Sequence, residues 1–381
     1  MPDDSRYPAL DVLRGFGLFG VLMVNLLYFF RISLFGHMVQ FHAHAGLLNH
    51  AIDIAVAAVL EFKAFALFSF TFGVGVAIQF ERVQKRGAGA GIFLLRRFLI
   101  LLGVGLIHMV FISNVDILCL YSICGLLLIP LLGLPHVWLW IVGIATIYVL
   151  SIGGPGLPAE TVLASHAIKA TEIYSQGTFG AILAFRWTET RELIWPLLIM
   201  VFPRTLGLMM LGVAAWKSGV VCTPRRYLGW LWTACILGSA IGGLNTLADL
   251  LKQTASAEID VPQVIRKVGS SEPLAAAYAA LLFATCSSDR VWLAPIAALG
   301  RMALSNYLMQ SIIFAAIFYG FGFGYFGRLD SASTSLIGLG VYVCQAGFSV
   351  WWLKRYRFGP FEWLWRSGTY GYWQPMKRPL L

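Results

Sequence analysis

The sequence predicts an all-α, polytopic helical membrane protein with about ten transmembrane helices. Of the 381 residues, 59% are hydrophobic and only 12% are charged. A soluble domain has about a quarter of its residues charged, so this chain lacks the polar side chains that would cover a water-soluble fold. Apolar runs of roughly 20 residues recur without the two-residue alternation of β-strands, which favours spanning helices.

The first apolar run is expected to be an uncleaved membrane helix. Asp3 and Asp4 precede it, it is long enough to span, and no small-x-small cleavage site follows it. An even number of spans then places both termini on the same side of the membrane. The expected spans are 13–30, 52–80, 97–113, 116–133, 136–152, 193–216, 228–249, 273–287, 296–324 and 334–353.

The distribution of positive charge predicts the orientation. Of the 28 Lys and Arg residues, 18 fall on the side of the termini, 8 fall on the opposite side, and Lys63 and Arg204 fall within spans. Loops rich in Lys and Arg are typically cytoplasmic, so both termini are expected in the cytoplasm. The basic, aromatic tail from Lys354 suits the lipid headgroup layer. Membrane lipids are expected partners and nucleic acid is not, because no basic run with interleaved aromatics is present.

Cysteine and histidine patterns predict no metal site. The six cysteines lie mostly in apolar runs with no C-x-x-C pair, so buried thiols are expected rather than a zinc site or disulfides. The loop 31–51 holds His37, His42, His44 and His50. Residues two apart do not share a helix face, so a solvated loop is expected there. The segment 160–190 is expected to lie as a helix along the outer interface.

The strongest functional candidates are His108 and Asp116, because ionisable groups inside apolar runs are energetically expensive. In an unbroken helix these two residues would lie about 12 Å apart along the axis. A turn at Ser113 and Asn114 would fold Asp116 back, so that its carboxylate orients the imidazole. The alternative is a packing role, in which His108 bonds to a neighbouring helix and Asp116 caps the next helix.

Four other polar residues lie at or inside the expected spans. Arg14 either anchors the first span at the cytoplasmic face or meets a phosphate. Asn25 either bonds across helices or lines a cavity. Lys63 either snorkels or pairs with a nearby acid. Arg204 follows Pro203, which is expected to break its span, and an arginine at such a break suits an anionic ligand.

Five motifs, in order along nearly the whole chain, resemble the YeiB-like family of bacterial inner-membrane proteins. They are L-D-V-L-R-G at 10–15 running to V-N at 24–25, F-K at 62–63 with F-G-V-G at 72–75, G-L-I-H at 105–108 with D-I-L at 116–118, G-R-M-A-L-S-N-Y at 300–307 and G-P-F-E-W-L-W-R at 359–366. The last two are the most specific, because they mark the family's carboxy-terminal domain of unknown function. The resemblance implies acyltransferase-like helices over 1–225 and a YeiB-type domain with a basic aromatic tail over 226–381.

That family is grouped with the transmembrane acyltransferases. Relatives such as heparan-alpha-glucosaminide N-acetyltransferase move an acetyl group from cytosolic acetyl-CoA to an acceptor across the membrane. The resemblance therefore implies an acyl-CoA donor, an unknown carbohydrate or lipid-linked acceptor, and no metal. The family usually has Trp and Gly shortly before the aspartate, whereas this chain has Ser113 and Asn114, so the local shape there does not carry over. The matching positions are Arg14, Asn25, Lys63, His108, Asp116, Arg301, Asn306 and Tyr307.

An acyltransferase function would give each of these residues a specific role. His108 is expected to be a general base or an acyl carrier, with Asp116 holding its tautomer. Lys63 or Asn25 is expected to stabilise the oxyanion. Guanidinium groups suit the donor's phosphates, and the candidates are Arg14, Arg96, Arg97, Arg225, Arg226 and Arg301. Arg204, Asn306 and Tyr307 complete the expected binding residues.

Two other functions stay open. A transporter or flippase for an anionic or lipid-linked solute would use the same broken helices, midplane arginine and buried glycines. A non-catalytic scaffold would recruit a partner through the aromatic tail. A homodimer is compatible with the sequence.

Overall fold

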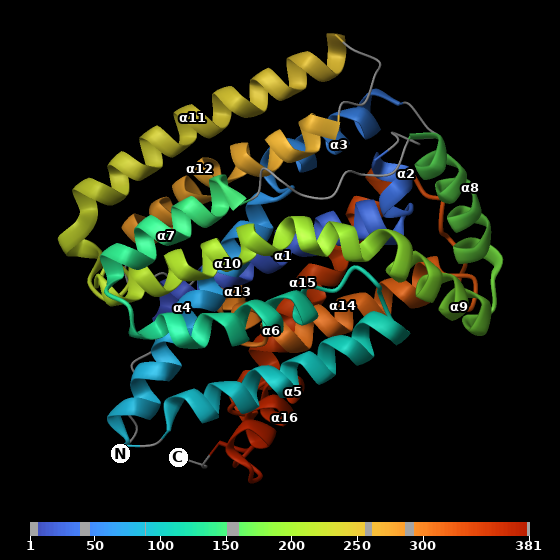
Figure 1. The fold of residues 1–381 in the computed structure, drawn as a ribbon. Helices are drawn as coiled ribbons and strands as arrows, with labels where there is room; N and C mark the ends of the chain where they lie inside the picture. Colours follow the sequence, from blue (N-terminus) through green and yellow to red (C-terminus); the bar gives the residue numbers. More distant parts are fainter. Residues whose placement is uncertain are drawn as a thin grey trace.

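The computed structural model describes residues 7–38, 46–87, 89–150, 160–255, 261–285 and 293–378. Within these ranges the chain is a bundle of helices, with one isolated β-bridge between Tyr356 and Lys377 (Figure 1). This confirms the all-α prediction. Four helical stretches among the described residues are long and apolar enough to cross a membrane: Pro8–Phe30, Ala90–Phe111, Pro224–Asp249 and Ser331–Arg355. The protein is thus a helical membrane protein, and the total of ten spans stays a prediction.

The helices follow the expected apolar runs in order. They are α1 (Pro8–Asn25), the π-helix η1 (Leu26–Phe30), α2 (Leu34–Met38), α3 (Leu47–Val59), α4 (Lys63–Lys85), α5 (Ala90–Phe111), α6 (Ile117–Leu128), the 3₁₀ helix η2 (Ile129–Gly133), α7 (His136–Tyr148), α8 (Glu160–Gln176), α9 (Phe179–Glu189), the π-helix η4 (Thr190–Ile194), α10 (Trp195–Lys217), the 3₁₀ helix η5 (Pro224–Tyr227), α11 (Leu228–Ala255), α12 (Val261–Thr285), α13 (Ala294–Arg301), α14 (Ala303–Phe318), α15 (Ser331–Arg355) and α16 (Pro360–Tyr370). The expected domain boundary at 225 falls in η5, and the division itself stays a prediction.

Helix α1 lies in the middle of the bundle and contacts α4 and α13 (Figure 1). Glycine makes close approach feasible where α13 crosses α1 and where α4 crosses α10. A Cβ atom at Gly300 would collide with the carbonyl oxygen of Asp11 on α1, and one at Gly73 would collide with Met209 on α10. Glycine therefore lets the backbones meet at both crossings.

The two ends of the bundle differ. At one end, where the N and C labels lie in Figure 1, α4 ends, α5 begins and α16 packs on α5; we call this the termini end. At the other end α2 packs on α8, and α8 packs on α9; we call this the far end (Figure 1). The expected helix over 160–190 is thus two helices joined at Gly177, whose N–H donates to the carbonyl of Ile173.

Two spans expected as single helices are each broken in two. The run 52–80 divides into α3 and α4 at Phe62, whose φ of 59° lies in the left-handed region. The run 296–324 divides at Met302, which caps both α13 and α14. Average hydropathy over a window does not register a change of direction made by one or two residues. The expected break at Pro203 is wrong, because α10 continues through it.

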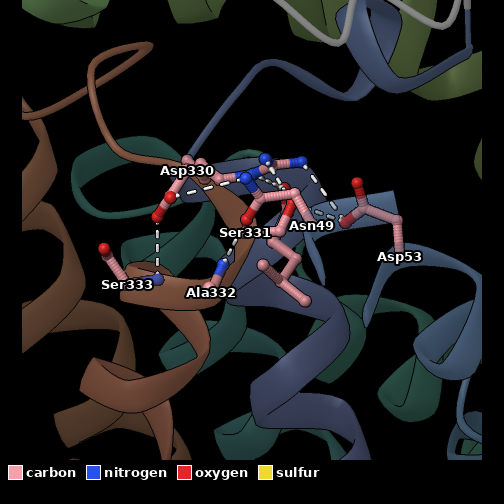
Figure 2. Close-up of polar contacts among 8 residues, drawn as sticks. Asn49, Asp53, Asp330, Ser331, Ala332 and Ser333 are labelled. Carbon is pink, nitrogen blue, oxygen red and sulfur yellow. Dashed lines mark hydrogen bonds and ion pairs between the residues drawn. The ribbon is translucent and has the colours of Figure 1, made fainter. Parts of the chain in front are cut away.

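A polar network ties α3 to the start of α15, as Figure 2 shows. The Arg31 guanidinium donates to Ser331 Oγ at 2.7 Å and lies 3.7 Å from Asp53 Oδ1. Ser331 Oγ in turn donates to Asp53 Oδ1 at 2.7 Å. Asp330 caps α15 by accepting from the N–H of Ser333, and its other carboxylate oxygen accepts from the Asn49 amide. The network fixes one end of α15 against α3.

Histidine and cysteine placements correct two expectations. His37 is not in a solvated loop, because its ring stacks on Tyr28 with centroids 3.6 Å apart. His50 is exposed on α3, while His42 and His44 lie outside the described residues. Cys119 and Cys124 are buried as expected, but Cys222 and Cys344 are exposed. Cys344 lies on an exposed face of α15, and Cys222 lies in the turn between α10 and η5.

Candidate functional site

The connection between α5 and α6 brings His108 and Asp116 together. Each is 1% exposed, and His108 Nδ1 lies 2.8 Å from Asp116 Oδ1. The other carboxylate oxygen accepts a hydrogen bond from the N–H of Cys119 at 2.7 Å, so Asp116 also caps α6. The two roles that the sequence left as alternatives, capping and facing the imidazole, therefore belong to different oxygens of one side chain.

The turn that produces this pairing has a simple local cause. Helix α5 ends at Phe111, and the N–H groups of Ile112 and Ser113 both donate to the carbonyl of His108, at 2.9 and 3.0 Å. Gly105, one turn before His108, lets α6 come close. A Cβ atom there would lie 2.7 Å from the Cys119 nitrogen and 3.0 Å from Asp116 Oδ2. The chain reverses direction because the helix ends at this point and a residue without a side chain faces the returning helix.

The surroundings of the imidazole determine which nitrogen can react. Nδ1 of His108 lies 2.8 Å from Asp116 Oδ1, although the two atoms do not meet the angular criteria for a hydrogen bond. A carboxylate beside Nδ1 favours the tautomer with its proton there. Among the described residues, Nε2 of His108 has no hydrogen-bond partner. The unprotonated Nε2 is therefore the atom available to accept a proton or attack a carbonyl carbon.

Tyr307 on α14 completes the pair. Its hydroxyl donates to Asp116 Oδ1 at 3.5 Å, and its ring lies 5.2 Å from the His108 ring. The sequence predicted Tyr307 as a residue that binds the acyl-CoA donor. The structure places it against the aspartate, 2% exposed, and its role in binding the donor stays a prediction.

Two other predicted residues, Asn306 and Lys63, tie helices together, and a third, Asn25 at the end of α1, is partly buried. Asn306 donates to Ser349 on α15 at 3.1 Å and to the carbonyl of Leu299 at 3.3 Å. Lys63 is 5% exposed at the start of α4 and donates to the carbonyl of Ala57 at 3.1 Å. The structure brings none of the three into hydrogen-bonding contact with His108 or Asp116, so their catalytic and binding roles stay predictions.

Arg204 is fully buried and forms an ion pair with Glu272 on α12. It also donates to the carbonyl of Phe62 at 3.2 Å, and its guanidinium lies over the Phe62 and Phe65 rings, 5.2 and 5.6 Å from their centroids. Three helices, α4, α10 and α12, meet at this side chain. An acid already balances its charge, so the expected anionic ligand would have to compete with Glu272.

The arginines expected to hold phosphates come from α1, α5, η5 and α13, and they have different surroundings. Arg14 lies 3.5 Å from Asp11 and donates to the carbonyl of Thr71 at 3.3 Å. The Arg97 guanidinium stacks 3.4 Å from the centroid of the Trp365 ring. Arg96, Arg225 and Arg226 are exposed, and Arg301 is partly buried. Arg14 and Arg97 thus contact neighbouring groups, and Arg96, Arg225 and Arg226 lie on the surface.

A cleft of about 660 Å³ lies at the termini end, between the end of α4, η2 and the end of α10. Its lining includes the cations Arg82, Lys85 and Lys217 and the aromatic ring of Trp216. Lys217 donates to two backbone carbonyls, at 2.5 and 2.7 Å, and its burial lowers its pKa. Hydrogen bonds from Lys85 and Trp216 lower the pKa of Glu81 beside them. A cleft of this size suits a small-molecule ligand.

Sequence reasoning missed the buried acids Glu272 and Glu189. Glu272 was placed in a polar loop, although it directly precedes Pro273, as Arg204 directly follows Pro203. That shared position beside an intrahelical proline was the available signal. Glu189, which accepts from Asn114, lies in a mixed polar segment that carries no such signal. Among the described residues, no three His, Cys, Asp or Glu side chains gather in a way that could hold a metal ion.

Comparisons with known proteins place the chain among uncharacterized relatives over nearly its whole length. Residues 215–372 match the family described as a protein of unknown function (DUF418). The chain is 31% identical to the uncharacterized protein YxaH of Bacillus subtilis, over 98% of this chain and 97% of the relative. It is 28% identical to an uncharacterized 39.9 kDa protein encoded in the amylase 3' region of Bacillus acidopullulyticus, over 96% and 94%. It is 26% identical to the uncharacterized protein YeiB of Escherichia coli, over 96% of both chains.

Proposed function

Because the chain belongs to the YeiB-like family, which carries the DUF418 region, we propose that it is a membrane-embedded acyltransferase. The proposed reaction moves an acetyl or other acyl group from cytosolic acyl-CoA to a periplasmic or lipid-linked acceptor. The proposal places the chain in a bacterial inner membrane with both termini in the cytoplasm. The excess of Lys and Arg on the side of the termini favours that orientation.

The observation that carries this proposal is the buried pairing of His108 with Asp116, 2.8 Å apart, with Nε2 unpartnered among the described residues. A histidine oriented by a carboxylate is a common general base. In the proposed step, Nε2 takes the proton of the acceptor hydroxyl or amine while the acceptor atom attacks the thioester carbonyl carbon. The carbon–sulfur bond breaks, and the imidazolium returns the proton to the CoA thiolate.

An acyl-histidine route uses the same atoms. Nε2 attacks the thioester carbonyl, the CoA thiolate leaves, and the acceptor then displaces the imidazole from the acyl group. Over the whole reaction, the acceptor loses one proton and the CoA thiolate gains it. Both routes need an unprotonated Nε2.

Access to the site requires movement. His108 is 1% exposed, so the surrounding helices must part before a thioester reaches Nε2. The cleft at the termini end offers the donor a docking place, because Arg82, Lys85 and Lys217 line it. Phosphate oxygens pair well with such cations, and Trp216 provides a surface for a base. In this proposal Arg82, Lys85 and Lys217 take the phosphate-binding role that was expected of the arginines.

The test uses purified protein in vesicles made from total membrane lipid, supplied with radiolabelled acetyl-CoA. The His108→Ala variant is expected to lose acyl transfer while it still binds acetyl-CoA. His50→Ala, a change at an exposed histidine on α3, is the matched control and is expected to transfer normally. Undiminished turnover by His108→Ala rejects the assignment.

A transporter or flippase for an anionic or lipid-linked solute is the second candidate. The buried pair of Arg204 and Glu272 favours it, because both residues sit beside intrahelical prolines on α10 and α12. Charged groups beside such prolines are typical of substrate paths through membranes. The two functions differ in one product: an acyltransferase releases free CoA thiol from acetyl-CoA, whereas a carrier moves solute without releasing thiol.

A further inference from the structure

Two side chains of α9, Arg186 and Glu189, contact the turn that joins α5 to α6. We call these two residues the α9 clamp. Arg186 Nη1 donates to the carbonyl of Phe111, the last residue of α5, at 3.2 Å. Glu189 Oε2 accepts from the side-chain amide of Asn114, two residues before Asp116. The clamp therefore holds the turn at both its beginning and its end. Figure 1 shows α8 and α9 at the end of the bundle where α5 finishes.

The clamp is buried and supported by aromatic neighbours. Arg186 is 2% exposed and Glu189 is 3% exposed. The hydroxyl of Tyr174 on α8 donates to Glu189 at 2.7 Å, and the Arg186 guanidinium lies 4.7 Å from the centroid of the Tyr319 ring. Burying a charged side chain is expensive unless hydrogen bonds or other charges balance it. These contacts make the position of α9 relative to the turn well defined.

Among the described residues, few backbone hydrogen bonds fix the turn, although Asp116 caps α6 and Val115 packs against the cluster of Phe35, Leu163, Ala167 and Ile194. The N–H groups of Ile112 and Ser113 bond back to His108, which fixes the end of α5 but not the path onward. Asn114 is 7% exposed, and its amide contacts Glu189 on a different helix. An amide-to-carboxylate contact thus supplies the constraint that the local backbone lacks.

We propose that Arg186 and Glu189 are positioning residues, which fix the α5–α6 turn and so hold Asp116 against His108. The inference deepens the proposed function, because it rests on His108 being the reacting residue. The α9 clamp touches neither of the two reacting partners directly. It acts on the backbone of Phe111 and on the side chain of Asn114, which flank them.

The decisive measurement is the tautomer of His108, read from the ¹⁵N resonances of its imidazole in histidine-labelled protein in lipid nanodiscs. A His108→Gln variant identifies these resonances by their loss. In the unaltered protein we expect the tautomer with the proton on Nδ1. Asn114→Asp, which sets two carboxylates face to face, is expected to shift the His108 resonances towards a mixture of tautomers. Asn114→Ala, which removes the donor, is expected to act in the same direction.

A swapped pair separates positioning from folding. Asn114→Asp combined with Glu189→Gln restores an amide-to-carboxylate contact with the donor and acceptor exchanged, and it is expected to return the His108 resonances to their original values. Thr188→Ala is the matched control, because Thr188 is exposed on α9 and its hydroxyl bonds within its own helix. If Asn114→Asp does not fold, Asn114→Ala and Tyr174→Phe provide the same readout. Folded Asn114→Ala protein with unchanged His108 resonances overturns the proposal.

Acyl transfer gives the second readout. Displacement of a catalytic group by about 1 Å can lower a rate about 100-fold, so kcat of Asn114→Asp is expected to fall about 10- to 100-fold with KM for acetyl-CoA nearly unchanged. If the His108 resonances shift as expected but the unaltered protein transfers no acetyl group, the α9 clamp stands and the acyltransferase proposal fails. If transfer is robust and the resonances do not move, the clamp fails alone.

Discussion

Tyr307 on α14 and Asp116 at the start of α6 lie 191 residues apart in the chain, and the tyrosine hydroxyl donates to the aspartate at 3.5 Å. Tyr307 belongs to the region 215–372 that matches the DUF418 family, whereas Asp116 and His108 precede that region. The contact therefore joins the family-specific part of the chain to the buried histidine.

Tyr307→Phe removes this donor and keeps the ring beside His108. A single hydrogen bond of this kind contributes about 1 kcal/mol, so acyl transfer is expected to fall about fivefold. Transfer rates of the purified protein in vesicles check this. Tyr325→Phe, at an exposed tyrosine, is the control and is expected to change nothing. A rate for Tyr307→Phe equal to that of the control contradicts the role given to the hydroxyl.

Gly105→Ala is expected to separate α5 from α6, because the added Cβ atom would lie 2.7 Å from the Cys119 nitrogen. Overpacking of this kind costs about 1–3 kcal/mol of stability. Gly103→Ala on the same helix meets nothing within 4 Å and is expected to be neutral or stabilising by up to about 1 kcal/mol. Thermal unfolding of the two variants in detergent measures the difference. Equal Tm values for both show that α6 does not depend on Gly105.

Glu362 on α16 caps a different helix, and this predicts a pH dependence. Its carboxylate accepts from the N–H and hydroxyl of Ser305 at the start of α14, whose own cap residue Met302 provides no side-chain bond. Burial raises the pKa of Glu362. The folded state then binds its proton more readily than the unfolded state, so this group's contribution to stability is present at low pH. The contribution is lost as pH rises through the raised pKa.

Glu362→Gln is expected to remove that loss, so its Tm falls less than that of the unaltered protein as pH rises. Glu81→Gln is a control of opposite sign. Hydrogen bonds from Lys85 and Trp216 lower the pKa of Glu81, so its contribution is present above the ordinary glutamate pKa and is lost as pH falls. Tm measured across the acidic and neutral range distinguishes the two. Parallel curves for Glu362→Gln and the unaltered protein contradict the prediction.

Glu272→Leu is expected to destabilise the protein by about 3–5 kcal/mol, because it leaves the guanidinium of Arg204 buried without a counter-charge. The double variant Arg204→Met with Glu272→Leu removes both charges and is expected to recover most of that stability. Denaturant unfolding of the single and double variants measures the coupling. Independent, additive effects would show that the pair does not act as a unit. Loss of solute movement in a stable double variant would support the transporter.

Patterns within one stretch of sequence predicted much of this protein. Apolar runs such as 97–113 and 334–353 correspond to α5 and α15, because a long run without alternation can satisfy its backbone in a membrane only as a helix. The pairing of His108 with Asp116 was also predictable, since Ser113 and Asn114 lie between them and favour a turn.

The partners of buried charges were not predictable in this way. Glu272 and Arg204 are 68 residues apart, and Glu189 and Asn114 are 75 apart, so only the packing of whole helices brings them together. Pro203 does not break α10, because neighbouring groups in a membrane protein can satisfy the backbone that a proline leaves unbonded. Phe62 divides the expected span 52–80 by adopting a left-handed conformation. The sequence gives no sign of this, because a phenylalanine rarely adopts that conformation.

The bend at Phe62 stores conformational energy, since a residue with a side chain in the left-handed region is strained by about 1–2 kcal/mol. The Arg204 guanidinium rests on both the carbonyl and the ring of that residue and so holds the bend closed. Drawing Arg204 away from Phe62, by an anion that competes with Glu272 for the guanidinium, would release this bend and let α3 move relative to α4. A change at the buried ion pair of Arg204 and Glu272 would in this way be converted into movement of α3.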